Sequence, residues 1–278
     1  MGRFSKLETN LPAEASAAKG RIDAGGGRSQ AASTGPGRPA AAEEPPTDAR
    51  GCVARAEEAF YSGEPREALR WYGRSLQRDG AYLDAWLGQV RLLLLTNQVG
   101  EAKVWINRAL SNFPDLPQLL ALRSAAHARS GMLRQGLALS DHILEQNGGD
   151  ALAWFCRGMI LSLAENRNAD FCFDQAIKLS PETDWTMPFS IGFFLYGERR
   201  YARAIAFLDQ ALERRTMLPY AWLLIAQANA HLGRREAARR ALTRAEEVCG
   251  ENERLLRRIQ RADTGSILSR LTGLFRRR

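Results

Sequence analysis

The sequence predicts an all-α protein in which a helical hairpin repeats about six times. Trp86, Trp154 and Trp222 follow one another in steps of 68 residues, which is twice 34. Small residues recur at 34-residue steps, and glycine recurs between stretches with helical periodicity. A fixed period of roughly 20 to 50 residues is typical of solenoids, in which neighbouring repeats bury one another's apolar faces.

Residues 1–48 precede the first repeat, and we expect them to form a disordered arm. They include "AGGGRSQAASTGPGRPAAAEEPP", which is rich in glycine, alanine, proline and serine and nearly free of large apolar side chains. Such a composition cannot bury enough apolar surface to offset the conformational entropy that is lost on ordering.

The predicted solenoid covers residues 49–252, and a column of small residues marks its copies. At 34-residue steps this column contains Ala68, Ala102, Gly136, Asp170, Ala204 and Ala238. Asp170 is the exception, and a one-residue deletion in the preceding turn, near "AENRNA", brings Ala169 into the column instead. Because a small side chain leaves room for a neighbouring backbone, the column predicts close contact between the two helices of each hairpin.

Two further columns define the hairpin. Sixteen residues before the small column stand mostly large apolar residues that anchor a first helix: Cys52, Trp86, Leu120, Trp154, Pro188 and Trp222. Gly63, Gly131 and Gly233 fall at the turn, where glycine adopts positive φ without a Cβ clash. Each copy is therefore predicted to be a helix, a tight turn and a second helix.

This pattern resembles the tetratricopeptide repeat, whose 34-residue unit has a Trp-Leu-Gly-Tyr front half followed by an alanine and an aromatic residue. "AWFCRGMI" (153–160) keeps the tryptophan and glycine at the family's spacing, and "YAWLLIAQANAHLGRREAARRAL" keeps Trp222, Gly233 and Ala238. The resemblance implies a right-handed α-solenoid over residues 49–252. We expect residues 253–264 to form a polar-faced helix that caps the last copy.

Charge and hydropathy indicate where the protein is located. The net charge is +8, and residues 197–278 carry 18 basic and 9 acidic side chains, so the excess lies at the C-terminal end. No apolar run approaches the roughly 18 residues that a membrane-spanning helix needs, and the N-terminus lacks the apolar core of a secretory signal. We therefore expect a cytoplasmic protein, with peripheral membrane contact as an alternative.

The sequence contains no pattern that carries chemistry. HExxH, GxSxG and phosphate-loop motifs are missing, and the three histidines have no carboxylate or cysteine at useful spacing. The cysteines stand far apart without metal-site or disulfide spacing, and we expect them to be buried thiols: Cys52, Cys156, Cys172 and Cys249. We predict that the protein is not an enzyme and binds no metal or cofactor.

The resemblance also implies a binding surface. In tetratricopeptide proteins the first helices line a concave groove that binds a peptide through positions 2, 5, 9 and 12 of each copy. In copies four to six these positions supply a strip of large side chains: Phe155, Met159, Phe189, Phe193, Tyr196, Tyr220 and Leu223. The expected partner is a protein or peptide with an apolar or amphipathic segment. The alternative is that these side chains are core, because a one-residue error in register turns them inward.

A second candidate surface is the basic tail, residues 265–278. Apolar residues recur on one helical face, and arginines accompany them: Ile267, Leu268, Arg270, Leu271, Leu274, Phe275, Arg276, Arg277 and Arg278. Such a segment can make weak contact with an anionic membrane. A flexible extension, docking into the chain's own groove and binding to a partner are the alternatives for this tail.

These observations predict an interaction adaptor or scaffold that holds a partner polypeptide in the groove, with a peripheral membrane or anionic-surface tether as the alternative. Nucleic-acid binding is disfavoured. Glu236, Glu246 and Glu247 interleave with the arginines of residues 234–244, and no aromatic stacking platform accompanies them.

Overall fold

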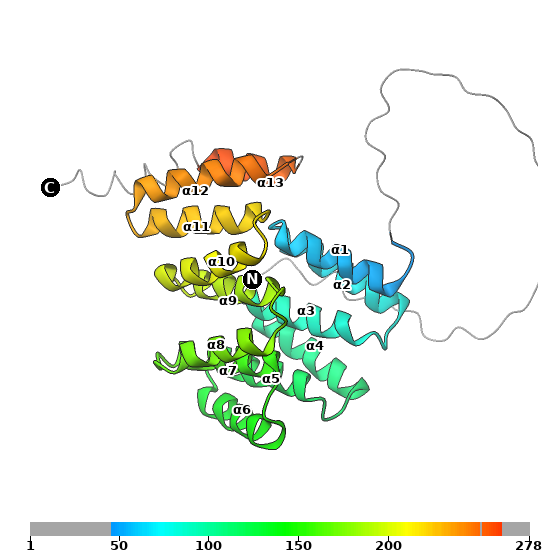
Figure 1. Ribbon diagram of the computed structural model, residues 1–278. Helices are drawn as coiled ribbons and strands as arrows, with labels where there is room; N and C mark the ends of the chain where they lie inside the picture. Colours follow the sequence, from blue (N-terminus) through cyan, green and yellow to red (C-terminus); the bar gives the residue numbers. More distant parts are fainter. Residues whose placement is uncertain (1–45, 251, 263–278) are drawn as a thin grey trace, which may run out of the picture. The chain divides into compact units, whose positions relative to one another are not determined.

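The computed structural model describes residues 46–250 and 252–262, which form thirteen helices and no strand. In chain order (Figure 1) the helices are α1 (Ala49–Tyr61), α2 (Pro65–Arg78), α3 (Leu83–Leu95), α4 (Val99–Asn112), α5 (Pro117–Arg129), α6 (Leu133–Asn147), α7 (Ala151–Leu163), α8 (Ala169–Leu179), α9 (Thr186–Gly197), α10 (Tyr201–Arg214), α11 (Pro219–His231), α12 (Arg235–Val248) and α13 (Glu253–Arg261). All thirteen helices belong to one compact unit that begins at Thr47.

The helices pair into six hairpins, from α1–α2 to α11–α12, and each hairpin packs against the next. The first helices of copies one to four and six begin at residues 49, 83, 117, 151 and 219, so they keep the 34-residue period, and α9 begins one residue late. Local signals place these starts, because Asp48 and Asp150 cap α1 and α7 while prolines open α5 and α11. The predicted all-α solenoid of about six hairpins is confirmed.

The turn inside each hairpin repeats more strictly than the sequence indicated. A residue with positive φ stands at every 34-residue step, and the positions are Gly63, Asn97, Gly131, Glu165, Arg199 and Gly233. After each, the next backbone N–H donates to a carbonyl five residues back, as Glu64 does to Ala59 and Arg200 does to Leu195. This is the hydrogen bond of a Schellman helix end. Glycine therefore marked only half of the turns.

The small column lies where the two helices of a hairpin touch. Ala68, Ala102, Ala169 and Ala204 are fully buried, whereas the side chain of Asp170 is 51% exposed. The predicted one-residue deletion before Ala169 is therefore correct. At Gly136, an added Cβ would lie 2.7 Å from the Ser124 carbonyl oxygen, so only glycine permits the approach of α5 and α6.

One apolar core runs through all six hairpins into α13, from Val53 to Ala262. All four cysteines are buried thiols, as predicted. Helix α13 falls inside the predicted 253–264 segment, and its Leu255 and Ile259 are buried. Nearly all of the predicted arm (1–48) and the whole of the predicted tail (265–278) lie outside the described residues. Within the described part, every helix is too short or too polar to cross a membrane.

Candidate functional site

The predicted binding strip lies on α7, α9 and α11, and none of its side chains is exposed. Phe155, Met159, Phe189, Tyr220 and Leu223 are buried, and Phe193 and Tyr196 are partly buried. The expectation of an open groove formed by all seven is therefore wrong for this structure. Two different kinds of contact bury these side chains.

Packing within their own hairpin contributes to the burial of the strip residues of copy four. The Phe155 ring lies 6.3 Å from Phe173, which belongs to the second helix of the same hairpin. Met159, one turn further along α7, is equally buried. For these two residues the alternative that the sequence left open holds, because they are core.

A remote segment covers Phe189 and Phe193 of copy five. We call Phe189, Phe193 and Tyr220 the aromatic strip. Phe60 and Tyr61, at the C-terminal end of α1, form an aromatic pair that lies against it. The Phe60 ring contacts Phe189 edge-on at 5.7 Å and Phe193 at 5.3 Å, and the Tyr61 ring lies 5.1 Å from Phe189. Edge-on contacts of this kind add stability beyond the area they bury.

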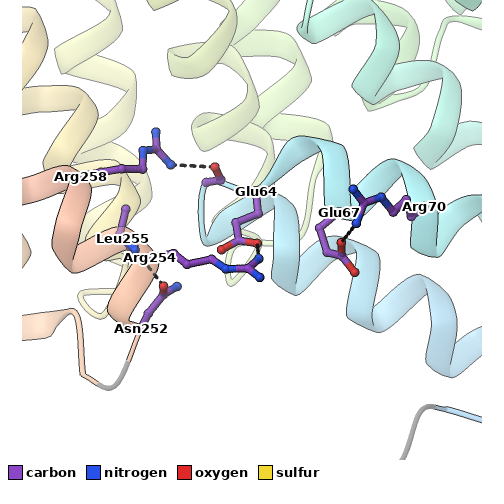
Figure 2. Close-up of polar contacts among 8 residues, drawn as sticks. Glu64, Glu67, Arg70, Asn252, Arg254, Leu255 and Arg258 are labelled. Carbon is purple, nitrogen blue, oxygen red and sulfur yellow. Dashed lines mark hydrogen bonds and ion pairs between the residues drawn. The ribbon is translucent and has the colours of Figure 1, made fainter. Parts of the chain in front are cut away.

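The turn after the aromatic pair is held by α13 (Figure 2). The Arg254 guanidinium forms an ion pair with the Glu64 carboxylate at 2.7 Å, and Arg258 donates to the Gly63 carbonyl oxygen at 2.7 Å. The Arg258 guanidinium also lies over the Tyr220 ring, 5.0 Å from its centre. The neighbouring carboxylate, Glu67, pairs instead with Arg70 in its own helix.

Gly63 is required at this turn for two reasons. Its φ is +81°, which strains any residue with a Cβ. A Cβ there would also lie 2.5 Å from the Arg258 Nη1 atom and 2.9 Å from the Tyr220 ring. The backbone of the first turn is therefore seated directly against α11 and α13.

A polar cluster lies at the inner face of copies one and two. Burial raises the pKa of Glu57, and the Arg91 guanidinium offsets that only in part. Burial alone would lower the pKa of Arg91, but Tyr61, Tyr72 and Glu57 raise it, so this side chain stays a cation. Burial also raises the pKa of Tyr61 and Tyr72, which therefore stay neutral phenols. The cluster balances buried charge and contains no nucleophile.

Tyr196 is a predicted strip residue that links two helices through its hydroxyl. Its hydroxyl donates to the Gln227 side-chain oxygen at 3.0 Å, which links α9 to α11. Burial raises its pKa to about 12, so it is a neutral donor at physiological pH. Among the described residues, no group of three or more His, Cys, Asp or Glu side chains could hold a metal ion.

A depression of about 540 Å³ lies between α6, α7 and α8. Trp154 and Phe171 meet edge-on in it at 5.9 Å, and Arg157 pairs with Asp141 at 2.5 Å. Phe171 is 57% exposed, which is unusual for a large apolar side chain. Sequence reasoning did not identify Phe171, although a signal exists, because Arg70 and Arg240 occupy its column in other copies.

Sequence reasoning also missed the residues that cover the strip. Phe60 stands at position 12 of the first copy, so extending the family's positions to that copy would have named it. No comparable signal marks Tyr61, Arg254 or Arg258 as its companions. The contacts of Arg254 and Arg258 join segments about 190 residues apart.

The fold is that of a protein built from repeated helical hairpins. Its candidate functional site is a surface, the aromatic strip. Comparison with protein families names the repeat, since residues 59–126 match the family model described as tetratricopeptide repeat. Residues 59–126 are therefore similar to the tetratricopeptide repeat that the sequence pattern predicted. A search of curated proteins found no match to this sequence.

Solved structures with a similar backbone arrangement were also found. A chain of the APC/C hetero-tetramer Cut9-Hcn1 is 18% identical, with a TM-score of 0.44, over 77% of this chain and 43% of that chain, so this chain spans less than half of its length. A tetratricopeptide repeat protein from Parabacteroides merdae is 17% identical, with a TM-score of 0.44, over 80% of this chain and 86% of that chain. YrrB, described as having an unusual peptide-binding site, is 17% identical, with a TM-score of 0.35, over 77% of this chain and 92% of that chain.

Proposed function

We propose that this protein is a non-catalytic adaptor or scaffold that binds a partner polypeptide through the aromatic strip of copies five and six. Proteins of the tetratricopeptide repeat class typically mediate protein–protein interaction and are generally non-catalytic. One observation carries the choice of surface: the strip already holds an apolar segment, the Phe60–Tyr61 pair of α1. We place this activity in the cytoplasm.

The chemistry of the strip defines the partner. Phe189, Phe193 and Tyr220 present ring faces and edges, which favour aromatic and aliphatic side chains. Binding of an amphipathic helix in such a groove uses apolar side chains that recur along one helical face. We therefore propose a partner with an amphipathic helical segment.

The test introduces a charge into the strip. Phe193 is partly buried, so Phe193→Glu places a carboxylate against the aromatic strip with limited disturbance of the core. Val104→Glu is the matched control, because Val104 is 49% exposed on α4. A partner is first captured with the wild-type chain, identified and purified, and its affinity is then titrated against all three proteins.

We expect Phe193→Glu to abolish binding of the purified partner while Val104→Glu binds like the wild type. Circular dichroism must show the same helix content in all three. Equal affinity of the wild type and a folded Phe193→Glu variant would overturn the strip as the binding surface.

A tether to an anionic surface is the second candidate. It is favoured by the basic side chains that precede the tail, since Arg239 and Arg257 are exposed on α12 and α13. We expect the full chain to sediment with phosphatidylserine vesicles at low salt and to be released at high salt. Sedimentation that persists unchanged after deletion of residues 265–278 would exclude the tail as the tether.

A further inference from the structure

The contacts of the first hairpin are of two kinds. Helix α1 packs against α2 and α3, as a repeat packs against its neighbours. Residues 60–64 in addition contact α9 and α13, and Gly63 lies close to Tyr220 of α11, all at the far end of the repeat array. A solenoid repeat needs only its neighbours for stability, so this second set of contacts is additional to the stacking.

The additional contact has an apolar part and a polar part. The apolar part consists of the Phe60–Tyr61 pair on the aromatic strip, and the Tyr61 ring also lies edge-on to Trp185 at 4.3 Å. In the polar part, Arg254 donates to the Glu64 carboxylate and Arg258 donates to the Gly63 carbonyl oxygen. The two parts are only three residues apart along the chain, so a short peptide segment can reproduce both.

The polar part is accessible to solvent. The Arg254 side chain is 73% exposed and that of Glu64 is 24% exposed. An ion pair this exposed is weak and is screened by salt, so it can exchange partners readily. The Glu64 carboxylate can therefore exchange its partner, whereas Phe60 and Tyr61 are buried and leave the strip only when the end of α1 opens.

Building on the proposed function, we infer that residues 60–64 are an internal ligand of the partner-binding strip, and that the partner replaces them with the same chemistry. That partner segment is an amphipathic helix that ends in two consecutive aromatic residues, with a carboxylate three residues beyond the second. The aromatic residues take the place of Phe60 and Tyr61 on the strip. The carboxylate takes the place of Glu64 beside Arg254.

Internal competition follows from this arrangement. The partner binds only molecules in which residues 60–64 have left the strip, so its apparent affinity falls with the fraction of open molecules. If about 1% of the molecules are open, apparent affinity is about 100-fold weaker than for a permanently open strip. Changes that loosen the first turn should therefore strengthen binding.

The probe for the experiment is the chain's own segment. A fluorescein-labelled peptide of residues 49–67, with Cys52 replaced by serine, contains α1, the aromatic pair and Glu64. The receptors are the full chain and its Phe60→Ala/Tyr61→Ala variant, and fluorescence anisotropy measures binding. We expect the peptide to bind the variant at least about tenfold more tightly than the wild type. A peptide with the same two alanine substitutions is the control and should not bind.

Charge reversal tests the polar part. In the Phe60→Ala/Tyr61→Ala background, Arg254→Glu should weaken binding of the unmodified peptide and restore binding of a Glu64→Lys peptide. Equal binding of both peptides to both receptors would remove Arg254 from the site. If the double alanine variant does not fold, Arg254→Glu alone serves as the receptor, because this exposed side chain can be changed without loss of the core.

The outcomes separate this inference from the proposed function. A peptide that binds neither receptor, or binds the wild type as tightly as the opened variant, overturns the internal ligand even if Phe193→Glu still loses the partner. A peptide that binds as expected while the Phe193→Glu variant keeps the partner supports the internal ligand and overturns the proposed function.

Discussion

The inner faces of copies three and five use the same repeat positions in opposite ways. Helix α5 presents Ala121, Ala125 and Ala128, whereas α9 presents Phe189, Phe193 and Tyr196. The alanines are buried because neighbouring helices approach closely, and α5 packs directly on α7. Phe189 and Phe193 of α9 pack instead against rings from α1.

Burial that lasts as long as the repeats stay stacked is permanent, and burial that depends on a remote segment is conditional. The cover of the alanines comes from adjacent repeats, and it persists as long as the stack exists. The cover of the aromatic strip comes from a segment more than a hundred residues away, and it depends on how the whole array curves. Local unfolding of α1 would expose the strip without exposing α5.

The largest expected effect comes from removing a ring of the strip. Phe189→Ala should lower the free energy of unfolding by about 3–5 kcal/mol, because it leaves a cavity beneath the aromatic pair. Urea unfolding measures this change, and amide hydrogen exchange should speed up in α1. Phe171→Ala is the matched control, since Phe171 is 57% exposed. A loss no greater than that of the control would contradict the structure at α9.

Overpacking tests the copy with the alanine face. Ala125 is fully buried, and Ala125→Leu should lower the free energy of unfolding by about 1–3 kcal/mol because its neighbours must shift. Exchange should rise in α5 and α7 and stay unchanged in α1. The same substitution at the exposed Ala138 should have little effect. Faster exchange confined to α1 would reverse the proposed division between permanent and conditional burial.

A smaller effect is expected from Glu57, which lies on α1 behind the aromatic pair. Burial raises the pKa of this carboxyl, with Arg91 opposing. The unfolded chain therefore loses the proton at a lower pH than the folded chain, and stability falls as the pH rises from the ordinary glutamate pKa through the raised one. Glu57→Gln should stabilise the protein at pH 7 relative to the wild type. Thermal unfolding at pH 4 and pH 7 measures this, and equal differences at both values would contradict it.

The smallest effect is expected at the exposed ion pair. Arg254→Ala should lower the free energy of unfolding by no more than about 1 kcal/mol, and the loss should shrink in high salt. Urea unfolding at low and high salt measures both. A salt-independent loss of several kcal/mol would mean that the turn is a fixed part of the fold, and the cover of the strip would then be permanent.

Most of the fold could be predicted from the sequence because its signals are local. A glycine turn, an alanine in contact with the next helix and an apolar face all lie within one copy. The structure adds Asn97, Glu165 and Arg199 to the turns, where the position demands positive φ and the residue is not glycine. The predicted strip was harder to interpret, because positions 2, 5, 9 and 12 are exposed or buried according to what lies opposite them.

The sequence by itself determined the repeating unit and the number of hairpins, since each depends on neighbours within about 34 residues. Only the tertiary structure decided that Phe60 and Tyr61 meet α9 and its N-cap residue and that Glu64 meets α13. The physical reason is cumulative geometry. Each hairpin adds a small rotation to the array, and the sum over six hairpins, which no single repeat encodes, decides whether the first turn reaches the last helices.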